Sequence, residues 1–561
     1  MLTRSLLLAL PLLWLNPSVF ADADKLNTQA VDALVQGYGQ PDEPGISVAI
    51  AKDGELIYEG WRGLADLERK VAIGQRTRFH IASISKQFTA YAVLKLAEEG
   101  KLRVDQPLSD FFPELEAGRG RVKLRHLLDH TGGLREVNTL VQLLGLSERA
   151  PVTAEQMLAL LLRQKGSNFV AGTDEEYSNS GYQLLAHVVA QLSRQSFADY
   201  LHSQVLDPLG MTETFVRTDP YALIENVAIS YAAARQPFVH HPVMATGVGS
   251  TGMVSTPKDL LRWGHSLNVA EAANDPILQA MAQRSRLPDG RVVVAANGQE
   301  FRQYRGVKTW SHGGTAGGFK SFLLRMPAEG IVIAVMGNRA DFLKAKFAFD
   351  VADVLLEHRL GPEPELDLRP ETEQELDRYV GDYRLFPGTV FSLRRDGKAL
   401  TFAGFGAADA VPLPSLSKGV FLLNPASDLR LEFRDFDDER ATQMRWQVSE
   451  DGYLLAKRVE MEPIGDAPIN ASLCAGTYYS DELQIGFDIF EKEGALWITS
   501  NLNAAIPLIQ YQPRTFRPEG PIPFGRLMFL EHGAKPVQTI LVSAPLAKDI
   551  RFERQVAASG P

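Results

Sequence analysis

The sequence predicts an α/β domain, in which an antiparallel sheet carries helices on both faces and an all-helical insertion, followed by two small all-β antiparallel barrels. Two hairpins bracket a long helix-rich stretch, an acidic Pro-containing linker begins at Gly361, and the chain beyond it repeats at an offset of about 95 residues. We expect residues 22–362 to form the α/β domain, 363–468 the first barrel and 469–561 the second.

The sheet is predicted from strands at both ends of the first domain. The β-branched runs at 46–51 and 55–58 flank an Asp-Gly turn, which is typical of a hairpin. A second pair of strands, 322–325 and 331–335, lies far downstream. The chain between the two pairs has mostly helical patterns, so both ends are expected to build one sheet with the helices packed on it.

The C-terminal half contains two similar all-β units. The segment from Phe391 to Leu400 recurs as Phe487 to Leu496, and Ala410 to Leu413 recurs as Ala505 to Leu508. Units rich in aromatic and branched strands are expected to close as small, lipocalin-like barrels, because closure removes exposed strand edges. The sequence leaves open whether the barrels only pack on the protein or also take part at the active site.

Composition and charge exclude several classes of protein. Hydrophobic residues are 45% and charged residues 22% of the 561 residues, which excludes a disordered or fibrous chain. The net charge is −10 and no dense Lys/Arg block occurs, so we expect no nucleic-acid partner. Cys474 is the only cysteine, which excludes an intramolecular disulfide and a Cys-ligated zinc site.

Residues 1–21 have the pattern of a signal peptide. Arg4 precedes the apolar run from Leu6 to Leu15, and Val19-Phe20-Ala21 has small residues at the positions that direct cleavage after Ala21. A membrane-spanning helix needs about 20 apolar residues, whereas this run is shorter and contains Pro11. We therefore expect a secreted or periplasmic protein without a transmembrane span.

Ser83-Ile84-Ser85-Lys86 is the first motif that can carry chemistry. It begins a predicted helix, so Ser83 and Lys86 share one helix face one turn apart. A desolvated, neutral lysine can take the serine proton, and the N–H groups at a helix start favour negative charge. The same pattern occurs in Ser415-Leu416-Ser417-Lys418 within a β unit, so the motif alone is weak.

Two further motifs supply complementary groups. Tyr177-Ser178-Asn179 is predicted in a turn, where a phenol can relay a proton and an amide can hold a substrate carbonyl. Ser311-His312-Gly313-Gly314-Thr315 leads into the downstream strands, where its glycines allow a substrate to lie along the strand and a backbone N–H to face an oxyanion. His130-Thr131-Gly132 also matches this last pattern but precedes Tyr177 in the chain.

Two other matches predict no site. Gly247-Val248-Gly249-Ser250-Thr251-Gly252 fits the dinucleotide pattern, but the next residues look extended and a helix begins only at Pro257, so the glycines do not open a helix. His240 and His241 are adjacent rather than spaced along one helix face, which favours a plain loop over a metal site.

The order S-x-x-K, Y-x-N, H-x-G resembles the penicillin-recognising serine hydrolases, which include class C β-lactamases, D-Ala-D-Ala carboxypeptidases, related esterases and D-aminopeptidases. The resemblance covers roughly residues 30–360, with supporting stretches at 125–134 and 252–256. It implies a β-lactamase/transpeptidase-like fold for the first domain. The two-barrel tail resembles the D-stereospecific aminopeptidases, in which a loop of the last barrel narrows the catalytic pocket.

The resemblance also implies roles for the motif residues. Ser83 attacks a carbonyl and forms an acyl-enzyme, while Lys86 and Tyr177 share the proton transfers. The backbone N–H groups of Ser83 and Thr315 form the oxyanion hole. The residues implied to bind substrate are Asn179, His312, Gly314 and Thr315. No metal or cofactor is implied.

His312 stands where β-lactamases have a lysine. A histidine with an ordinary pKa of about 6.5 is mostly neutral at pH 7, which favours a substrate without an obligatory carboxylate, such as a peptide amide or an ester. Glu175 and Glu176 lie beside Tyr177 and are able to attract an amine, although a solvated turn is the favoured interpretation of this pair.

The sequence therefore predicts an exported serine hydrolase that acts through an acyl-enzyme on amide bonds, with D-amino-acid amides or peptides as favoured substrates. The alternatives are a β-lactamase or carboxylesterase of the same chemistry, or, in another class, a slowly deacylating binder or sensor. The expected partner is a small-molecule or short-peptide substrate, and a homodimer is left open.

Overall fold

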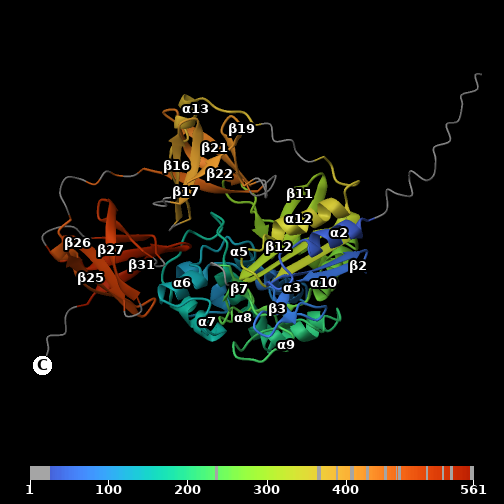
Figure 1. Cartoon of the computed structure of the whole chain (residues 1–561). Helices are drawn as coiled ribbons and strands as arrows, with labels where there is room; N and C mark the ends of the chain where they lie inside the picture. The colour runs from blue at the N-terminus through green and yellow to red at the C-terminus, as the bar shows by residue number, and fades with distance from the viewer. Residues whose placement is uncertain are drawn as a thin grey trace, which may run out of the picture.

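The computed structural model describes residues 26–555 except 116, 234–237, 363–367, 387–388, 405–409, 425–428, 448–451, 461, 463, 465–468, 501–502, 521–523 and 531–534. The predicted signal peptide, residues 1–21, lies outside the described residues. Figure 1 shows an N-terminal α/β domain and two separate β domains that follow it in the chain.

One sheet of seven strands forms the centre of the first domain, in the order β10-β11-β12-β13-β14-β1-β2. Its strands are β1 (Ile46–Lys52), β2 (Glu55–Arg62), β10 (Ala295–Ala296), β11 (Gln299–Tyr304), β12 (Val307–Ala316), β13 (Phe319–Met326) and β14 (Ile331–Gly337). The first strand pairs with the last, antiparallel, with Ile50 opposite Ile333. The prediction that both ends of the domain build one antiparallel sheet is confirmed.

Helices cover both faces of this sheet, which explains why β1 is apolar along its whole length. Ile46, Val48 and Ile50 belong to a core shared with α2 (Thr28–Gln36) and α12 (Lys344–Leu355). The alternate residues Ala49 and Ala51 face the larger core on the other side. That core includes α10 (Pro257–Ala272), which begins at Pro257 with Thr256 as its N-cap, as the sequence predicts.

The remaining elements of this domain form the helical insertion and three small sheets. The helices are α3 (Ser85–Glu98), α4 (Ala117–Gly120), α5 (Leu124–Leu128), α6 (Val137–Leu143), α7 (Ala154–Arg163), α8 (Asn179–Ser193), α9 (Phe197–Leu201) and α11 (Pro276–Met281), with the short turns η1 (Ala82–Ile84), η2 (Leu108–Asp110), η3 (His202–Leu206) and η4 (Pro327–Glu329). The short strands are β3 (Leu64–Asp66), β4 (Val71–Ala72), β5 (Phe79–His80), β6 (Phe215–Val216), β7 (Tyr231–Ala232), β8 (Val239–His240) and β9 (Met253–Ser255). His240 therefore ends a strand, and its prediction as a loop is wrong.

The first β domain is a nearly closed barrel of nine antiparallel strands, in the order β18-β17-β16-β15-β23-β22-β21-β20-β19. The two ends of this sheet, β18 and β19, are separated only by Pro414. The elements are α13 (Glu373–Asp377), β15 (Gly381–Phe386), β16 (Thr389–Asp396), β17 (Ala399–Gly404), β18 (Val411–Leu413), β19 (Ser415–Ser417), β20 (Val420–Asn424), β21 (Leu429–Asp437), β22 (Arg440–Gln447) and β23 (Tyr453–Val459).

The second β domain is a closed barrel. Its elements are α14 (Ala471–Cys474), β24 (Gly476–Ser480), β25 (Ile485–Lys492), β26 (Ala495–Ser500), β27 (Asn503–Gln512), β28 (Thr515–Pro518), β29 (Arg526–Phe529), β30 (Thr539–Ala544) and β31 (Ala547–Arg554). The predicted fold class, an α/β domain followed by two small antiparallel barrels, is confirmed.

Both barrels contain the same buried tyrosine and arginine arrangement. In the first barrel Tyr383 donates to the Tyr379 carbonyl at 3.0 Å, and Arg458 lies over the Tyr383 ring. In the second barrel Tyr478 donates to the Cys474 carbonyl at 2.8 Å, and Arg554 occupies the equivalent place. The repeat in the sequence is therefore also a repeat in local structure.

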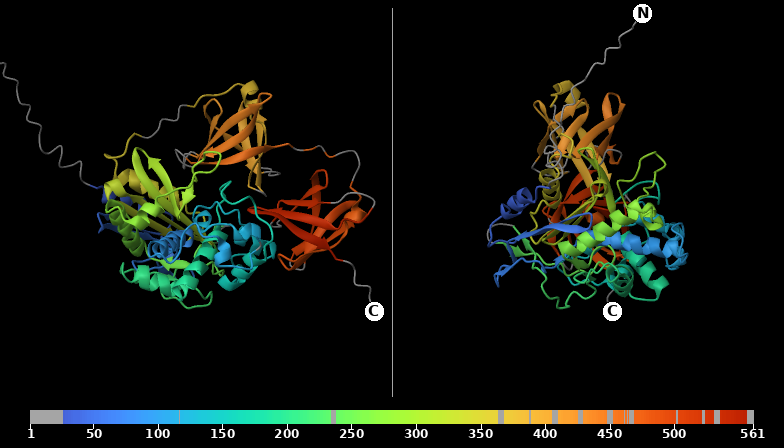
Figure 2. Two further views of the ribbon diagram at one scale, coloured as in Figure 1. Left: turned by 180° about the vertical axis from the view of Figure 1, so that it is seen from behind. Right: turned by 90° about the vertical axis from the view of Figure 1, so that its right-hand side faces the viewer.

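The second barrel lies beside the helical insertion near α6 (Figure 1), and the left view of Figure 2 shows the same neighbourhood from behind. Hydrogen bonds join the hairpin between β30 and β31 to the α/β domain, including one from the Glu136 N–H to the Leu546 carbonyl at 2.8 Å. Among the helices of the described residues, none is both long enough and apolar enough to cross a lipid bilayer.

Candidate active site

Ser83 lies in η1, directly before α3, and its side chain is partly exposed rather than sealed in the core. Ala82, the preceding residue, has a φ of 48°, a left-handed conformation that is unfavourable for a residue with a side chain. This turn brings the Ser83 hydroxyl to the start of α3, where unpaired backbone N–H groups favour negative charge.

Lys86 lies one turn further along and is fully buried, with 0% of its surface exposed. Its Nζ atom is 3.3 Å from Ser83 Oγ, 2.6 Å from Asn179 Oδ1 and 2.9 Å from the Ser250 carbonyl. Burial lowers the pKa of Lys86 to about 7, although the Glu136 carboxylate opposes that shift. A substantial fraction of this amine is therefore neutral at pH 7 and able to accept a proton.

Tyr177 completes the group around the serine hydroxyl. The Lys86 Nζ atom lies 4.8 Å from the centre of the Tyr177 ring. Burial raises the pKa of Tyr177, and its hydrogen bond with Ser83 lowers it to a smaller extent. The phenol consequently keeps its proton near pH 7 and is a donor rather than a base.

Glu136 is a residue of this site that the sequence analysis missed. Its carboxylate accepts hydrogen bonds from the Asn179 N–H at 2.7 Å and from Asn179 Nδ2 at 2.8 Å. Asn179 begins α8 rather than lying in a turn as predicted, so this anion faces the positive end of a fifteen-residue helix. Burial raises the pKa of Glu136, but the N–H donors and the Lys86 amine favour the charged form.

The strand β12 brings the H-x-G motif against the nucleophile. A Cβ atom at Gly314 would lie 2.1 Å from the Ile81 carbonyl and 2.3 Å from Ser321 Oγ, so only glycine allows this approach. Thr315, the next residue, is exposed. The strand edge that would receive a substrate therefore runs beside the residues that lead into Ser83.

His312 is buried, with 2% of its surface exposed, and its Nδ1 atom lies 2.9 Å from the Gly313 carbonyl. Burial, together with the nearby Lys86 and Lys344 amines, lowers the pKa of His312 to about 3. The imidazole is therefore neutral at pH 7. The ordinary pKa of histidine already predicts this state, and burial lowers the pKa of His312 further below 7. Its Nε2 atom has no hydrogen-bond partner among the described residues.

An amine does reach the end of this strand, from a residue that the motifs did not indicate. Lys344, the first residue of α12, donates hydrogen bonds to the Gly314 carbonyl and to Thr315 Oγ1. Burial lowers the pKa of Lys344 to about 7. No pattern in the sequence signals this contact, because Lys344 reaches the strand only when α12 packs on the folded sheet.

Glu175 and Glu176 are buried, with 7% and 5% of their surfaces exposed, so their prediction as a solvated turn is wrong. The Glu175 carboxylate accepts from the backbone N–H groups of Val294 and Ala295, and Glu176 accepts from Asn168. Both side chains therefore hydrogen-bond to groups of the protein interior.

The remaining sequence matches have other roles. His130 Nδ1 accepts from the Ser178 N–H at 3.1 Å, and its ring lies 4.5 Å from that of Tyr177, so it supports the Y-x-N motif. The glycine-rich segment 247–252 packs on α8 and presents the Ser250 carbonyl to Lys86. Ser415 lies in β19 of the first barrel, where Lys418 pairs with Glu375.

Within the described part of the chain, no group of three or more His, Cys, Asp or Glu side chains gathers in a way that suits a metal. The arrangement instead offers a nucleophile, a buried amine, a phenol and a strand edge, which together suit acyl transfer.

Comparison with known proteins matches the family described as Beta-lactamase to residues 30–355. A D-aminopeptidase of Brucella canis is 25% identical over 537 residues, which cover 93% of this chain and 98% of the relative.

Two solved structures of lower identity show the likeness in fold. An octameric penicillin-binding protein homologue from Pyrococcus abyssi has a TM-score of 0.52 at 23% identity and covers 79% of this chain and 99% of its own. A D-amino acid amidase from Ochrobactrum anthropi SV3 has a TM-score of 0.50 at 23% identity and covers 59% of this chain and 97% of its own.

Proposed function

Because this chain belongs to the Beta-lactamase family of serine hydrolases, we propose that it cleaves amide bonds of D-amino-acid amides or short peptides through an acyl-enzyme on Ser83. The observation that carries the proposal is the fully buried Lys86 amine, 3.3 Å from the Ser83 hydroxyl. The D-amino-acid specificity rests on the D-aminopeptidase relatives, which align with nearly the whole chain.

In the acylation step, neutral Lys86 takes the Ser83 proton while Ser83 Oγ forms a bond to the substrate carbonyl carbon. The carbonyl electron pair moves onto oxygen, where the N–H groups of Ser83 and Thr315 stabilise the oxyanion. The C–N bond then breaks as Tyr177 donates its proton to the leaving amine, and Lys86 returns a proton to the phenolate. Water completes the reaction by attacking the ester and restoring the Ser83 hydroxyl.

The neutral state of His312 supports an amide substrate that has no obligatory carboxylate. A fixed cation at position 312 would attract such a carboxylate, whereas a neutral imidazole does not. Lys344 is the observation that favours a second candidate, hydrolysis of β-lactams, since its amine contacts Thr315 at the end of the same strand. A carboxylate-bearing substrate would have to be recognised by Lys344 rather than by residue 312.

We also propose that the protein is exported to the periplasm or secreted, on the basis of the signal-peptide pattern at residues 1–21. Sequencing the N-terminus of the mature protein from a cell fraction tests this. A mature chain that begins at Asp22 is expected, and an intact Met1 in the cytoplasm would contradict the proposal.

A panel of D- and L-amino-acid p-nitroanilides, short-chain esters and β-lactams tests the substrate class. We expect the D-anilides to be turned over fastest, and Ser83→Ala to lower kcat/KM by about 10⁴-fold or more. Ser415→Ala is a matched control, since that serine has the same S-x-x-K pattern within the first barrel. Activity of Ser83→Ala equal to wild type would mean that the nucleophile is wrong, and faster turnover of a cephalosporin would favour the β-lactam candidate.

A further inference from the structure

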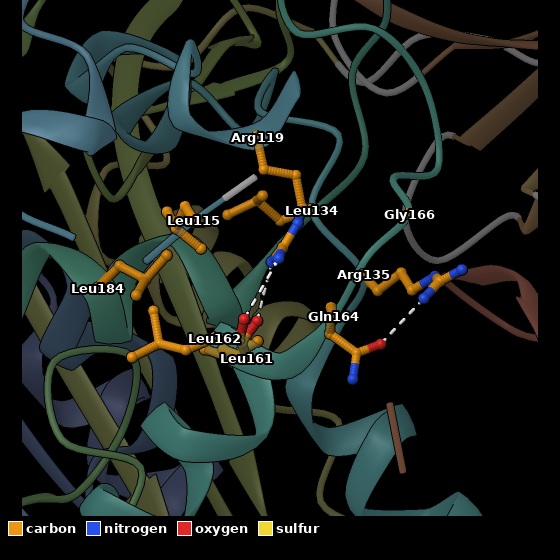
Figure 3. Close-up of a pocket in the computed structure, with 9 residues that line it drawn as sticks. All are labelled: Leu115, Arg119, Leu134, Arg135, Leu161, Leu162, Gln164, Gly166 and Leu184. Carbon is orange, nitrogen blue, oxygen red and sulfur yellow. Dashed lines mark hydrogen bonds between the residues drawn. The ribbon is translucent and has the colours of Figure 1, made fainter. Parts of the chain in front are cut away.

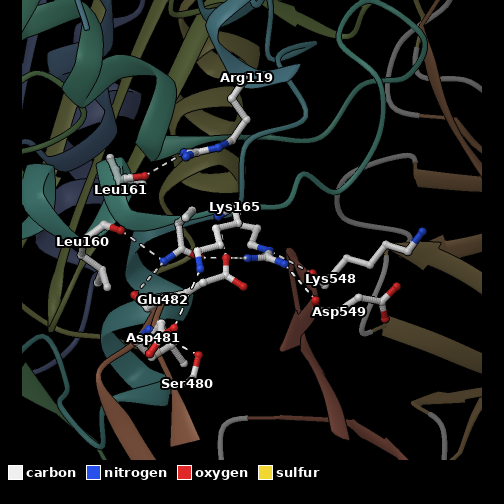
Figure 4. Close-up of polar contacts among 12 residues, drawn as sticks. Arg119, Leu160, Leu161, Lys165, Ser480, Asp481, Glu482, Lys548 and Asp549 are labelled. Atoms are coloured by element: carbon white, nitrogen blue, oxygen red, sulfur yellow. Dashed lines mark hydrogen bonds and ion pairs between the residues drawn. The ribbon is translucent and has the colours of Figure 1, made fainter. Parts of the chain in front are cut away.

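The second barrel meets the α/β domain through a buried ion pair. Glu482, from the turn between β24 and β25, pairs with the Arg135 guanidinium, and both residues are nearly fully buried, at 4% and 3% exposed. Glu482 also accepts from the Lys165 N–H at 2.6 Å, and its own carbonyl accepts from Gln164 Nε2 at 3.3 Å (Figure 4). The turn of the barrel is therefore fixed by both charge and backbone contacts.

Arg135 connects this turn to a second point of the barrel. Its guanidinium donates to the Lys548 carbonyl at 2.8 Å and to the Asp549 carbonyl at 2.9 Å, both at the start of β31. Figure 3 shows that Arg135 lines a hollow whose other walls are mainly leucine side chains. The guanidinium points away from these leucines and is buried at the interface, and because an unpaired buried charge is costly, Arg135 depends on its partners from the barrel.

The hairpin between β30 and β31 makes the third contact, at a strained residue. Leu546 has a φ of 62°, which is rare for a bulky side chain. The Leu546 carbonyl accepts from the Glu136 N–H and from Asn168 Nδ2, each at 2.8 Å. Thr139, in the first turns of α6, donates to the neighbouring Pro545 carbonyl at 2.7 Å. The barrel thus holds the segment from Arg135 to Thr139 at several points.

That segment is the one that reaches the nucleophile. The Glu136 carboxylate holds Asn179, and Asn179 Oδ1 in turn accepts from the Lys86 amine at 2.6 Å. We propose that the second barrel is a positioning element of the active site, in which Glu482 acts through Arg135, and Leu546 through Glu136, to fix Asn179 and Lys86 for proton transfer. This inference rests on the proposed serine hydrolase chemistry at Ser83.

A positioning role differs from the role of a barrel that only covers or narrows the substrate pocket. A covering loop would change substrate binding, whereas loss of positioning changes the proton-transfer step itself. A displacement of about 1 Å at a reacting group lowers the rate by about 100-fold. Loss of the barrel contacts is therefore expected to lower kcat and to leave KM nearly unchanged.

The sharpest test is Glu482→Gln with Asp481→Asn as the matched control. Both remove one negative charge from neighbouring residues of the same turn, but the Asp481 side chain is 79% exposed and lies 3.9 Å from Lys165 Nζ. We expect Glu482→Gln to lower kcat on a D-alanine p-nitroanilide by about 10- to 100-fold with little change in KM. Asp481→Asn is expected to leave both values unchanged.

The pH profile distinguishes positioning from a loss of general stability. The titratable groups that face Lys86 are Glu136, Tyr177, Tyr182, His130 and His312. Of these, the Glu136 carboxylate is the neighbour that raises the pKa of Lys86. If Glu136 moves away, Lys86 loses its proton at lower pH, and the acidic limb of the kcat/KM profile shifts to lower pH. A purely structural interface would leave that limb where it is.

Thr139→Val keeps the proposal testable if Glu482→Gln does not fold. It removes one hydrogen bond to Pro545 with little change of side-chain shape, and we expect a loss of about 3- to 10-fold in kcat with the same direction of pH shift. The rate at which a fluorophosphonate labels Ser83, followed by mass spectrometry over the same pH range, gives a readout that needs no known substrate.

The results separate the two proposals. A wild-type protein that hydrolyses no D-amino-acid amide but is labelled at Ser83 would contradict the substrate class, while the labelling profiles of the variants still decide the positioning role. The positioning role alone would be overturned if Thr139→Val folds and keeps the wild-type kcat, labelling rate and acidic limb of the pH profile. The same result is required of Glu482→Gln where that variant folds.

Discussion

Gly314→Ala should damage catalysis through a steric contact that can be read directly from the structure. The new methyl group would lie 2.1 Å from the Ile81 carbonyl oxygen and 2.3 Å from Ser321 Oγ. It would also occupy the place of the hydrogen bond that Ser321 donates to the Ile81 carbonyl at 2.8 Å. Neither atom is at the end of a flexible side chain free to turn away, since the first is backbone and the second is held by that bond.

The overlap gives the size of the effect. An ordinary carbon to oxygen contact is about 3.4 Å, so β12 and the Ile81 segment must separate by about 1 Å. That shift would move the Thr315 N–H away from the Ser83 N–H, its partner in the proposed oxyanion hole. A misplacement of this size lowers kcat/KM by about 100-fold, or about 2.7 kcal/mol in the barrier.

Gly313→Ala is the matched control on the same strand. Its methyl group would first meet Lys344 Cε at 3.0 Å, a contact that a movement of a few tenths of an ångström relieves, so we expect a loss of at most about 5-fold. Steady-state kinetics on a D-alanine p-nitroanilide, with thermal melts to show that both variants fold, give the comparison. Gly314→Ala with activity within about 3-fold of wild type would refute the assignment of β12 as the substrate strand.

Three further predictions follow from the charges at and near the site. We expect kcat/KM to rise with pH through about 7, because burial lowers the pKa of Lys86 to about 7 and the amine must lose its proton to act as a base; a profile that is flat through neutral pH would contradict this role. His312→Lys should increase the kcat/KM ratio for carboxylate-bearing over uncharged substrates several-fold, and an unchanged ratio would remove His312 from substrate recognition. Burial raises the pKa of Glu176 to about 8, so the folded protein keeps a proton that the unfolded chain has lost, and the free energy of unfolding falls as pH rises from about 5 to about 8. Glu176→Gln should therefore raise the melting temperature at pH 8 by a few degrees more than at pH 5, and equal changes at the two pH values would count against this titration.

The elements that follow a local rule could be predicted from the sequence. The Asp-Gly hairpin of β1 and β2 and the capped start of α10 depend on nearby residues. The motifs at Ser83 and Lys86 are likewise local, because a helix turn fixes their separation. The two barrels were predictable because a repeated pattern appears twice in one chain.

The supporting residues could not be predicted, because they act across long distances in the chain. Glu136 is an acidic residue before an ordinary helix, and only the docking of α8 gives it Asn179 as a partner. Lys344 reaches Thr315 because α12 packs on the sheet, which no pattern around Lys344 signals. Glu175 and Glu176 were predicted to be solvated because no charged partner lies near them in the sequence. Glu175 is bound by the backbone N–H groups of Val294 and Ala295, which are far away in the chain, and Glu176 by the uncharged Asn168 amide.

The paired tyrosine and arginine arrangement of the two barrels bears on which of their parts can differ. Because Tyr383 with Arg458, and Tyr478 with Arg554, lie inside each unit, the loops at the barrel rims can differ without disturbing these contacts. Only the later copy has Glu482 at its rim, where it meets Arg135. The two copies therefore share the contacts that lie inside each barrel, whereas the rim contact through Glu482 belongs to the second.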